Sequence, residues 1–351
     1  MKKNKTIRLL NEKISFLLDQ RAVTVCVFLF LAVSVVLVTS TAMGEMKIHP
    51  LNVVKALIGG GEESDRLVVT MFRLPRVLVA LLAGMALAAA GAILQGMIRN
   101  PLASPDMLGI TGGASVFVIM FLAIFSDNNH SLTVSIQWLP LAAFIGATVI
   151  AFLVYLLAWK DGVTPIRLVL IGIGIMSLMK ALTTFMMVLG PIYQTSQANI
   201  WIIGTVSGAT WQSVAMLAPW TLLFLLLAFV FARNINVQEL GDDVATGLGE
   251  HVQKNRFILL LLSTGLIAGA VAFAGGIGFV GLMAPHMARR LVSPAFSALL
   301  PASAFLGGIM VMTADLAGRM LFSPLEIPAG VFTAAIGAPY FIYLLYKTRS
   351  A

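Results

Sequence analysis

The stretch NINVQELGDDVATGLGEHVQKNR, residues 234–256, is a polar island in a chain that is otherwise mostly apolar. Arg233 precedes the island, and Lys254 and Arg256 lie at its far end. Basic residues gather in the cytoplasmic loops of membrane proteins, so this loop is predicted to face the cytoplasm.

The middle of this loop, residues 242–249, has room only for a short helix. Asp242 or Asp243 can cap its N-terminus, where free backbone amides favour an acidic side chain. Gly247 and Gly249 are suited to end it. Two interpretations follow: the helix presents a rigid docking surface to a soluble partner, or the loop is solvated and has no partner.

The composition places the chain among polytopic membrane proteins. Its 351 residues are 59% hydrophobic and 11% charged, with a mean hydropathy of +0.96, whereas a soluble domain has about 25% charged residues. The single cysteine, Cys26, lies in an apolar run, and the four histidines are scattered. Neither a disulfide framework nor a metal site is therefore predicted.

Apolar stretches long enough to cross a bilayer recur about ten times, which predicts an all-α membrane protein. Residues 1–21 are interpreted as a cytoplasmic amphipathic segment, because the apolar run begins only at Ala22 and lacks the cleavage pattern of a signal peptide. Residues 22–349 then form one transmembrane domain. The spans are predicted at residues 22–43, 75–98, 107–125, 139–159, 165–189, 213–233, 256–274, 278–291, 299–317 and 328–346, of which 278–291 is short.

The distribution of Lys and Arg indicates that both termini are cytoplasmic. Ten spans place sixteen basic residues inside and six outside, and Lys180 falls within a span. The net charge of +8 is therefore interpreted as a topology signal and not as a nucleic-acid surface. The inner residues are Lys2, Lys3, Lys5, Arg8, Lys13, Arg21, Arg99, Lys160, Arg167, Arg233, Lys254, Arg256, Arg289, Arg290, Lys347 and Arg349; the outer ones are Lys47, Lys55, Arg66, Arg73, Arg76 and Arg319.

Charged residues inside or beside the spans are candidates for function. Lys180 either lines a translocation pathway as a gating cation or occupies a wet niche without touching substrate. Asp315 and Arg319 are four residues apart, a spacing that lets them pair on one helical face. His286 has no carboxylate or cysteine nearby in the sequence and is interpreted as a buried histidine and not as a ligand.

Arginines also gather at the predicted outer surface. Arg73 and Arg76 lie three apart at the start of a span, with Pro75 suited to its first helical turn. Together with Arg319 they can form a basic rim that grips carboxylates of an acidic partner. The alternative is ordinary anchoring to lipid headgroups.

The spans are rich in small residues, as in GMALAAAGAILQG (Gly84–Gly96), which permits the close helix packing of a many-helix transporter or channel. The sequence contains no G-x-x-x-x-G-K-[ST] loop, so it is not predicted to be an enzyme, and any ATP hydrolysis must come from another polypeptide.

Several separated motifs resemble the iron–siderophore and cobalamin permeases of ABC importers, the FecCD type, and most closely the ferric-siderophore branch. The resemblance covers almost everything after about residue 45. It is carried by RLPRVLVALLAGMALAAAGAILQGMIRNPLASPDMLGITGGA (Arg73–Ala114), WIIGTVSGATW (Trp201–Trp211), LGDDVATGLG (Leu240–Gly249), GGIGFVGLMAPHMARRLV (Gly275–Val292) and LEIPAGVFTAAIGAPYFIYLL (Leu325–Leu345).

The resemblance implies the type II ABC importer permease fold, with two permease subunits, two ATPase subunits below and a binding protein above. It implies that Arg73, Arg76 and Arg319 meet glutamates of the binding protein. One departure is Thr205–Val206, where many relatives have Ser-Leu in a Trp-x-x-Gly-Ser-Leu motif. The implied ATPase-coupling residues are Leu240, Gly241, Asp242, Asp243, Ala245, Gly247, Leu248 and Gly249.

The implied function is uptake of a ferric siderophore across the cytoplasmic membrane of a bacterium. No cofactor is expected in this chain, since ATP and magnesium would bind the ATPase, and no nucleic-acid partner is expected. The second permease subunit is expected to be a paralogue, with a homodimer as the alternative, and the siderophore is either a hydroxamate or a catecholate. Rival readings are a haem or cobalamin permease, an ion-coupled secondary transporter and a membrane scaffold.

Overall fold

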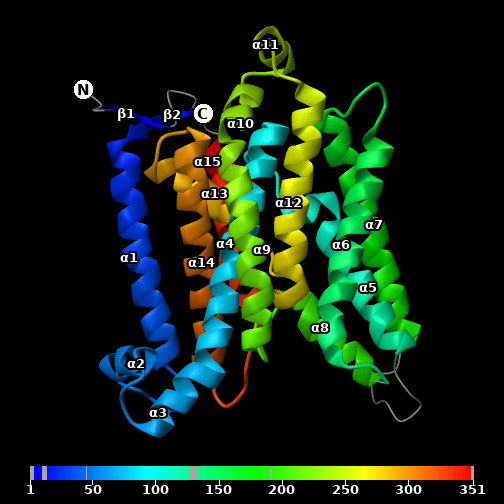
Figure 1. The fold of residues 1–351 in the computed structure, drawn as a ribbon. Helices are drawn as coiled ribbons and strands as arrows, with labels where there is room; N and C mark the ends of the chain where they lie inside the picture. Colours follow the sequence, from blue (N-terminus) through cyan, green and yellow to red (C-terminus); the bar gives the residue numbers. More distant parts are fainter. Residues whose placement is uncertain (1–3, 10–13, 45, 126–132, 190–191, 349–351) are drawn as a thin grey trace.

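The computed structural model describes residues 4–9, 14–44, 46–125, 133–189 and 192–348, and it is a bundle of long helices running in a common direction (Figure 1). The predicted inner residues Lys2, Lys3, Lys13 and Arg349 lie outside the described residues. The long helices are α1 (Gln20–Ala42), α4 (Leu74–Ile98), α5 (Ile110–Ile124), α6 (Leu139–Ala158), α7 (Pro165–Leu189), α9 (Trp211–Val230), α12 (Val252–Ala274), α13 (Val280–Leu291), α14 (Phe296–Met320) and α15 (Ala329–Thr348).

Each predicted span coincides with one of these helices. Within the described residues, seven helical stretches are long and apolar enough to cross a membrane, while α5, α13 and α15 are shorter or less apolar. The chain is therefore a multi-pass membrane protein, and the count of ten crossings stays a prediction. The shorter elements are α2 (Pro50–Leu57), α3 (Glu63–Leu67), a π-helix (Val68–Arg73), 3₁₀-helices at Pro105–Leu108 and Ile136–Trp138, α8 (Ile192–Ile203), α10 (Ala232–Glu239) and α11 (Asp242–Gly247).

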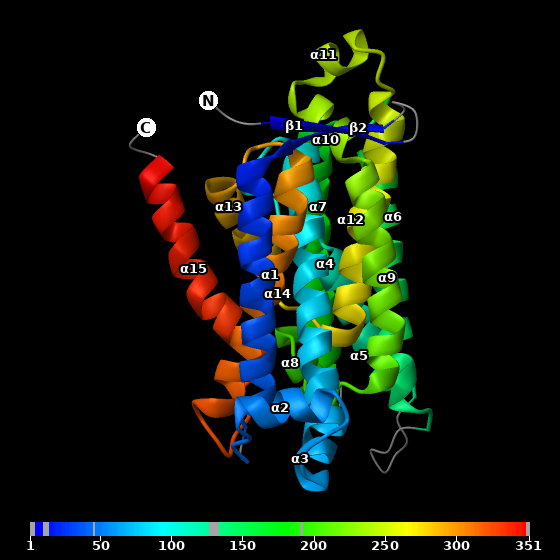
Figure 2. The ribbon, with the colours of Figure 1, turned by 60° about the vertical axis from the view of Figure 1, so that its left-hand side comes forward.

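The two ends of the bundle carry different elements. The N-terminal strands, α11 and the end of α15 lie at one end, and α2 and α3 lie at the other (Figures 1 and 2). Both ends of the described chain, Asn4 and Thr348, are therefore on the side of the polar 234–256 loop, as the predicted even number of crossings requires. Which side of the membrane this is stays a prediction.

The all-helical prediction holds for the bundle but not for the N-terminal segment. Strands β1 (Asn4–Leu9) and β2 (Ile14–Asp19) pair in antiparallel register, from Asn4 opposite Asp19 to Leu9 opposite Ile14. β-Branched and aromatic residues such as Ile7, Ile14 and Phe16 favour strands over helix. Helix α1 then begins at Gln20, two residues before the predicted span.

The second span begins earlier than the sequence suggested. Helix α3, the π-helix and α4 are continuous from Glu63 to Ile98. Pro75 lies in the first turn of α4, as predicted, although the chain before it is already helical. A π-turn absorbs a break in the regular ladder, and here it ends two residues before Pro75, which has no N–H to donate.

Helix α4 is the centre of the bundle, and small residues set its packing. Gly84 lies against the backbone of Gly307 in α14, and Gly91 lies against the backbone of Gly281 in α13. Because lipid supplies no hydrophobic force between helices, such close approach is what gains dispersion energy. The whole of α4 from Ala86 to Ile98 is buried.

Helices α5 and α13 both begin inside the bundle and not at its ends. The ring of Pro105, in the 3₁₀-turn before α5, lies close to Gly281 at the start of α13. The turn before α13 contains Phe279, whose φ of 67° is unusual for a residue with a side chain. Two interrupted segments therefore meet beside α4, an arrangement typical of transport proteins.

We predict that Gly91→Val destabilises the bundle, because a Cβ at Gly91 would overlap the backbone of Gly281. Overpacking of this kind costs about 1–3 kcal/mol. Thermal unfolding of the purified subunit in detergent measures the effect. Gly174→Val in α7 is the matched control, because a Cβ there meets no atom within 4 Å; equal stability of the two variants would contradict the packing.

Candidate functional site

Residues 232–250, called the coupling segment after the role that the sequence predicts for it, project from one end of the bundle (Figure 1). Helix α10 (Ala232–Glu239) leads to Gly241, whose φ of 110° turns the chain into α11 (Figure 1). Gly249, with a φ of 83°, follows the helix and ends it as predicted. The helix also forms where the sequence predicted it, between two membrane spans.

The predicted capping by Asp242 or Asp243 is wrong. The N-cap is Gly241, and it makes no side-chain capping bond. Both aspartates lie in the first turn, where their charges still favour the helix dipole. Asp242 does not cap because arginines from two other elements hold its carboxylate.

An apolar face on the coupling segment points away from the bundle. Val244 and Leu248 are 49% and 63% exposed and lie one helical turn apart, on one face of α11. Leu240, just before the turn at Gly241, is 61% exposed, whereas Ala245 is fully buried. The sequence prediction included Leu240, Leu248 and Ala245 but missed Val244, which the four-residue spacing could have revealed.

Asp242 joins the coupling segment to the helical core. Arg256 of α12 donates from Nη2 to both carboxylate oxygens of Asp242, at 2.9 and 3.1 Å, and Arg99 at the end of α4 donates to Oδ1 at 3.0 Å. Arg256 is only 2% exposed. A buried guanidinium left without its carboxylate would be strongly destabilising, so the three residues hold one another in place.

The turn at residues 159–163 is hydrogen-bonded to Arg256, the residue that also binds Asp242. Arg256 also donates to the carbonyl of Val163, and the amide of Val163 donates to Gln253 Oε1 at 2.9 Å. Arg167 donates to the carbonyls of Ala158, Lys160 and Gly162. The turn and the coupling segment therefore belong to one rigid unit.

Glu250 closes the far side of the segment. It accepts hydrogen bonds from Asn234 at the start of α10 and from Asn255 in α12. The two ends of the loop are thereby clamped together, so α11 projects as a stiff knob and not as a free loop.

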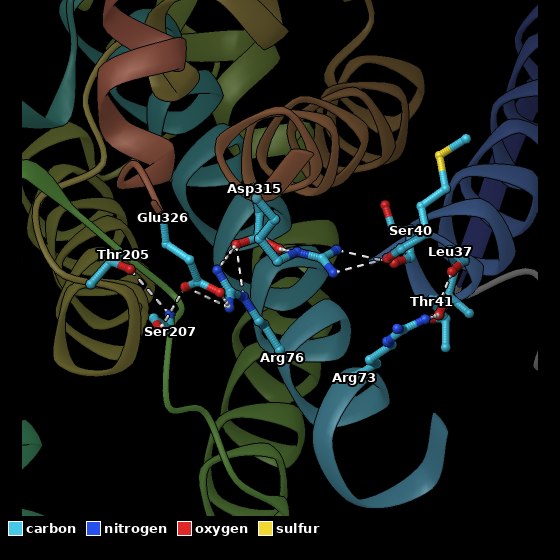
Figure 3. A network of polar contacts seen from close by, with 11 residues as sticks. Leu37, Ser40, Thr41, Arg73, Arg76, Thr205, Ser207, Asp315 and Glu326 are labelled. Atoms are coloured by element: carbon cyan, nitrogen blue, oxygen red, sulfur yellow. Dashed lines mark hydrogen bonds and ion pairs between the residues drawn. The ribbon is translucent and has the colours of Figure 1, made fainter. Parts of the chain in front are cut away.

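At the opposite end of the bundle, Arg76 lies between two carboxylates (Figure 3). Its guanidinium contacts Asp315 of α14 at 2.9 Å and Glu326 at 3.0 Å. Asp315 is 3% exposed, whereas the Glu326 side chain is 48% exposed and also accepts from Ser207 at 3.1 Å. Ser207 follows Thr205–Val206, so the loop that departs from the family pattern joins this network.

The other two rim arginines also turn inward. Arg73 donates to the carbonyls of Thr41 and Ala42 at 3.0 Å (Figure 3). Arg319 pairs with Asp315 at 3.1 Å, which confirms the predicted spacing, and it donates to carbonyls of the α1 end. The structure therefore brings Arg76 and Arg319 together on Asp315, and docking of a partner at this rim stays a prediction.

A comparison with known protein families matches residues 31–347 to the FecCD transport family. The chain belongs to the FecCD transport family. It is 55% identical to the "Probable siderophore transport system permease protein YfhA" of Bacillus subtilis (strain 168), over 95% of this chain and 97% of that one. It is 48% identical to the achromobactin transport system permease protein CbrC of Dickeya dadantii (strain 3937), over 91% and 90%.

A solved structure shares the fold of this FecCD chain. An inward-facing metal-chelate type ABC transporter superposes with a TM-score of 0.82 at 28% identity, covering 92% of this chain and 99% of that chain. The agreement over nearly the full length supports the arrangement of α4, α13 and α14 described above.

Lys180 lies on an exposed face of α7 in this FecCD chain. Ser177 and Thr184 lie on the same side of the helix, and their hydroxyls donate to the carbonyls of Ile173 and Lys180. An ammonium on an exposed face within a membrane helix is costly in lipid. Water or another subunit is therefore the expected neighbour of this face in the assembled protein.

Proposed function

We propose that this chain is a permease subunit of an ATP-driven ABC importer that takes up ferric siderophores across the cytoplasmic membrane of a bacterium. Membership of the FecCD family and the names of its relatives support the substrate class. The single observation that carries the mechanism is the exposed apolar knob Leu240–Val244–Leu248, clamped to the core through Asp242. A purely solvated loop has no need of either feature.

The proposed assembly has two copies of an ABC ATPase at the α11 end and a second permease subunit, favoured as a paralogue. A substrate-binding lipoprotein docks at the α2–α3 end. The absence of a P-loop motif from the sequence assigns ATP and magnesium to the ATPase. In this orientation both termini are cytoplasmic.

Transport follows from the rigid unit at the α11 end. Closure of the ATPase pair moves the knob, and the ion pairs of Asp242 carry that motion into α4 and α12 as a rigid-body change. Lys180 either lines the pathway or occupies a wet niche without touching substrate. The cargo is large and polar, and selection in the binding protein removes the need for a dense polar site in the spans.

The rival function, an ion-coupled secondary transporter, has one observation in its favour. Asp106 lies where the two interrupted segments meet, near Gly278, and its Oδ1 accepts from Thr111 at 3.1 Å. Coupling ions bind to such broken helices in secondary transporters. Within the described part of the chain, however, no group of three or more acidic, histidine or cysteine residues could hold an ion.

Uptake assays separate the two functions. Proteoliposomes with the permease pair, the ATPase and the binding protein are expected to accumulate labelled ferric siderophore when ATP is enclosed, and to do so in the presence of a protonophore. An ATPase-inactive partner is expected to abolish uptake, because the energy comes from hydrolysis. Uptake that a protonophore abolishes, and that persists with the inactive ATPase, would establish the rival instead.

The apolar knob generates a second prediction. Val244→Glu combined with Leu248→Glu should weaken retention of the ATPase subunits by about tenfold or more, because a charge would be buried without a partner at the interface centre. Co-purification of the ATPase with the permease measures retention. Ile58→Glu, at an exposed apolar position at the opposite end, is the control and should retain the ATPase normally.

The basic rim of Arg73, Arg76 and Arg319 generates a third prediction. Arg73→Gln removes a charge while an amide can still donate to the carbonyls that Arg73 contacts, so the fold should be kept. We expect docking of the binding protein to weaken roughly fivefold at low salt and to depend less on salt. Arg66→Gln, an exposed arginine at the same end, is the matched control. Unchanged affinity of the Arg73 variant at both salt concentrations would identify Arg73 as a structural residue only.

A further inference from the structure

A second ion pair joins the coupling segment to α13, a helix that Asp242 does not contact. Glu239, the last residue of α10, lies 3.7 Å from Arg289 Nη1 in the last turn of α13. Both side chains are about one quarter exposed. Burial raises the pKa of Glu239, and the Arg289 charge opposes that change. Arg289 therefore favours the charged form of this carboxylate.

Helix α13 connects this ion pair to α15 at two points. The His286 ring packs edge-on against Tyr340 of α15, with ring centroids 6.0 Å apart. At the other end of α13, the Phe279 ring lies against Gly337 of α15. Phe279 also has the left-handed φ noted above, and strain of this kind persists only where the surroundings enforce it.

Beyond these contacts, α15 separates from the bundle. Its last turns stand apart from α13 and α14 in Figure 2, and Ile342, Tyr343 and Tyr346 are 66%, 51% and 77% exposed. Pro339, inside the helix, removes a backbone hydrogen bond where this departure begins. The α15 arm therefore begins where α13 contacts α15, at Gly337 and Tyr340.

Helix α13 packs against α4 through its backbone. The backbone of Gly91 lies against that of Gly281, and Gln95 Nε2 donates to the carbonyl of Leu282 at 3.3 Å. Small sliding of packed helices is one form of transport-related change, and α13 would move in this way as a rigid unit.

We propose that α13 is the strut that carries movement of the coupling segment to the inner arm of α15, and that Arg289, through Glu239, is the positioning residue that ties the strut to the segment. This inference rests on the proposed function. It differs from the ion pairs of Asp242, which fix the segment to α4 and α12. Asp242 thus holds the knob to the core, and Glu239 links the knob through α13 to the α15 arm.

Charge exchange in the complete transporter tests the tie. Arg289→Glu and Glu239→Arg should each raise the ATP hydrolysed per siderophore transported by about fivefold or more, because a coupling free energy is lost. The double variant Glu239→Arg/Arg289→Glu should restore the ratio to within about twofold of the parent. Glu239→Arg should give no such rescue of Arg290→Glu, the adjacent exposed arginine. Wild-type ratios in the single variants, or no recovery in the double variant, would overturn the proposal.

A distance measurement tests the same proposal if a charge-reversal variant is poorly expressed. In a Cys26→Ser background, spin labels at Tyr343→Cys on α15 and Leu261→Cys on α12 report the arm against the core, since both positions are exposed. The distance change on ATP binding should fall to less than about half in Arg289→Lys, whose point charge cannot reproduce the guanidinium fork. An unchanged response with this milder variant would count against the strut.

The outcomes also separate this inference from the proposed function. If the parent transporter does not couple ATP hydrolysis to siderophore uptake, the proposed function fails before the strut is tested. If the parent transports and retains the ATPase while the Arg289 variants behave like it in both assays, only the strut is wrong.

Discussion

The packing of backbone against backbone around α4 is the constraint on which the rest of the structure depends. Within a bilayer, apolar side chains gain little by leaving lipid for one another, so helices associate where small residues let them approach closely. Gly84 and Gly91 bring α14 and α13 against α4 in this way. These contacts fix where the ends of α4 lie, and the ends carry Arg76 on one side and Arg99 on the other.

The two ends of α4 are tied by ion pairs of the same design. At one end Arg76 shares Asp315 with Arg319, and at the other Arg99 shares Asp242 with Arg256. At each end a buried charge, Asp315 or Arg256, is compensated by a partner on another element. Breaking such a buried pair costs about 3–5 kcal/mol. The core is thus a stiff body with a projecting knob, and stiffness is what permits motion at the knob to reach distant helices.

Local sequence patterns predicted the helices well because span length and apolarity are local properties. They also predicted the Asp315–Arg319 pair, since four-residue spacing is a helical distance. They failed where a side chain binds a partner far away in the sequence instead of a local backbone group. Asp242 does not cap α11 because Arg256 and Arg99 occupy its carboxylate, and the rim arginines turn inward because carbonyls and Asp315 are within reach. The N-terminal hairpin was missed because a short amphipathic segment suits either helix or strand.

The sequence by itself determined that this is a multi-pass helical membrane protein of the FecCD type with a short helix between α10 and α12. Composition, apolar run length and motif order carry that information without reference to contacts. Only the tertiary structure decided which charges pair, that Val244 completes an exposed apolar face, and that α13 lies between Glu239 and α15. The physical reason is that ion pairs and helix contacts depend on distances in space, and residues such as Arg76 and Asp315 are far apart along the chain.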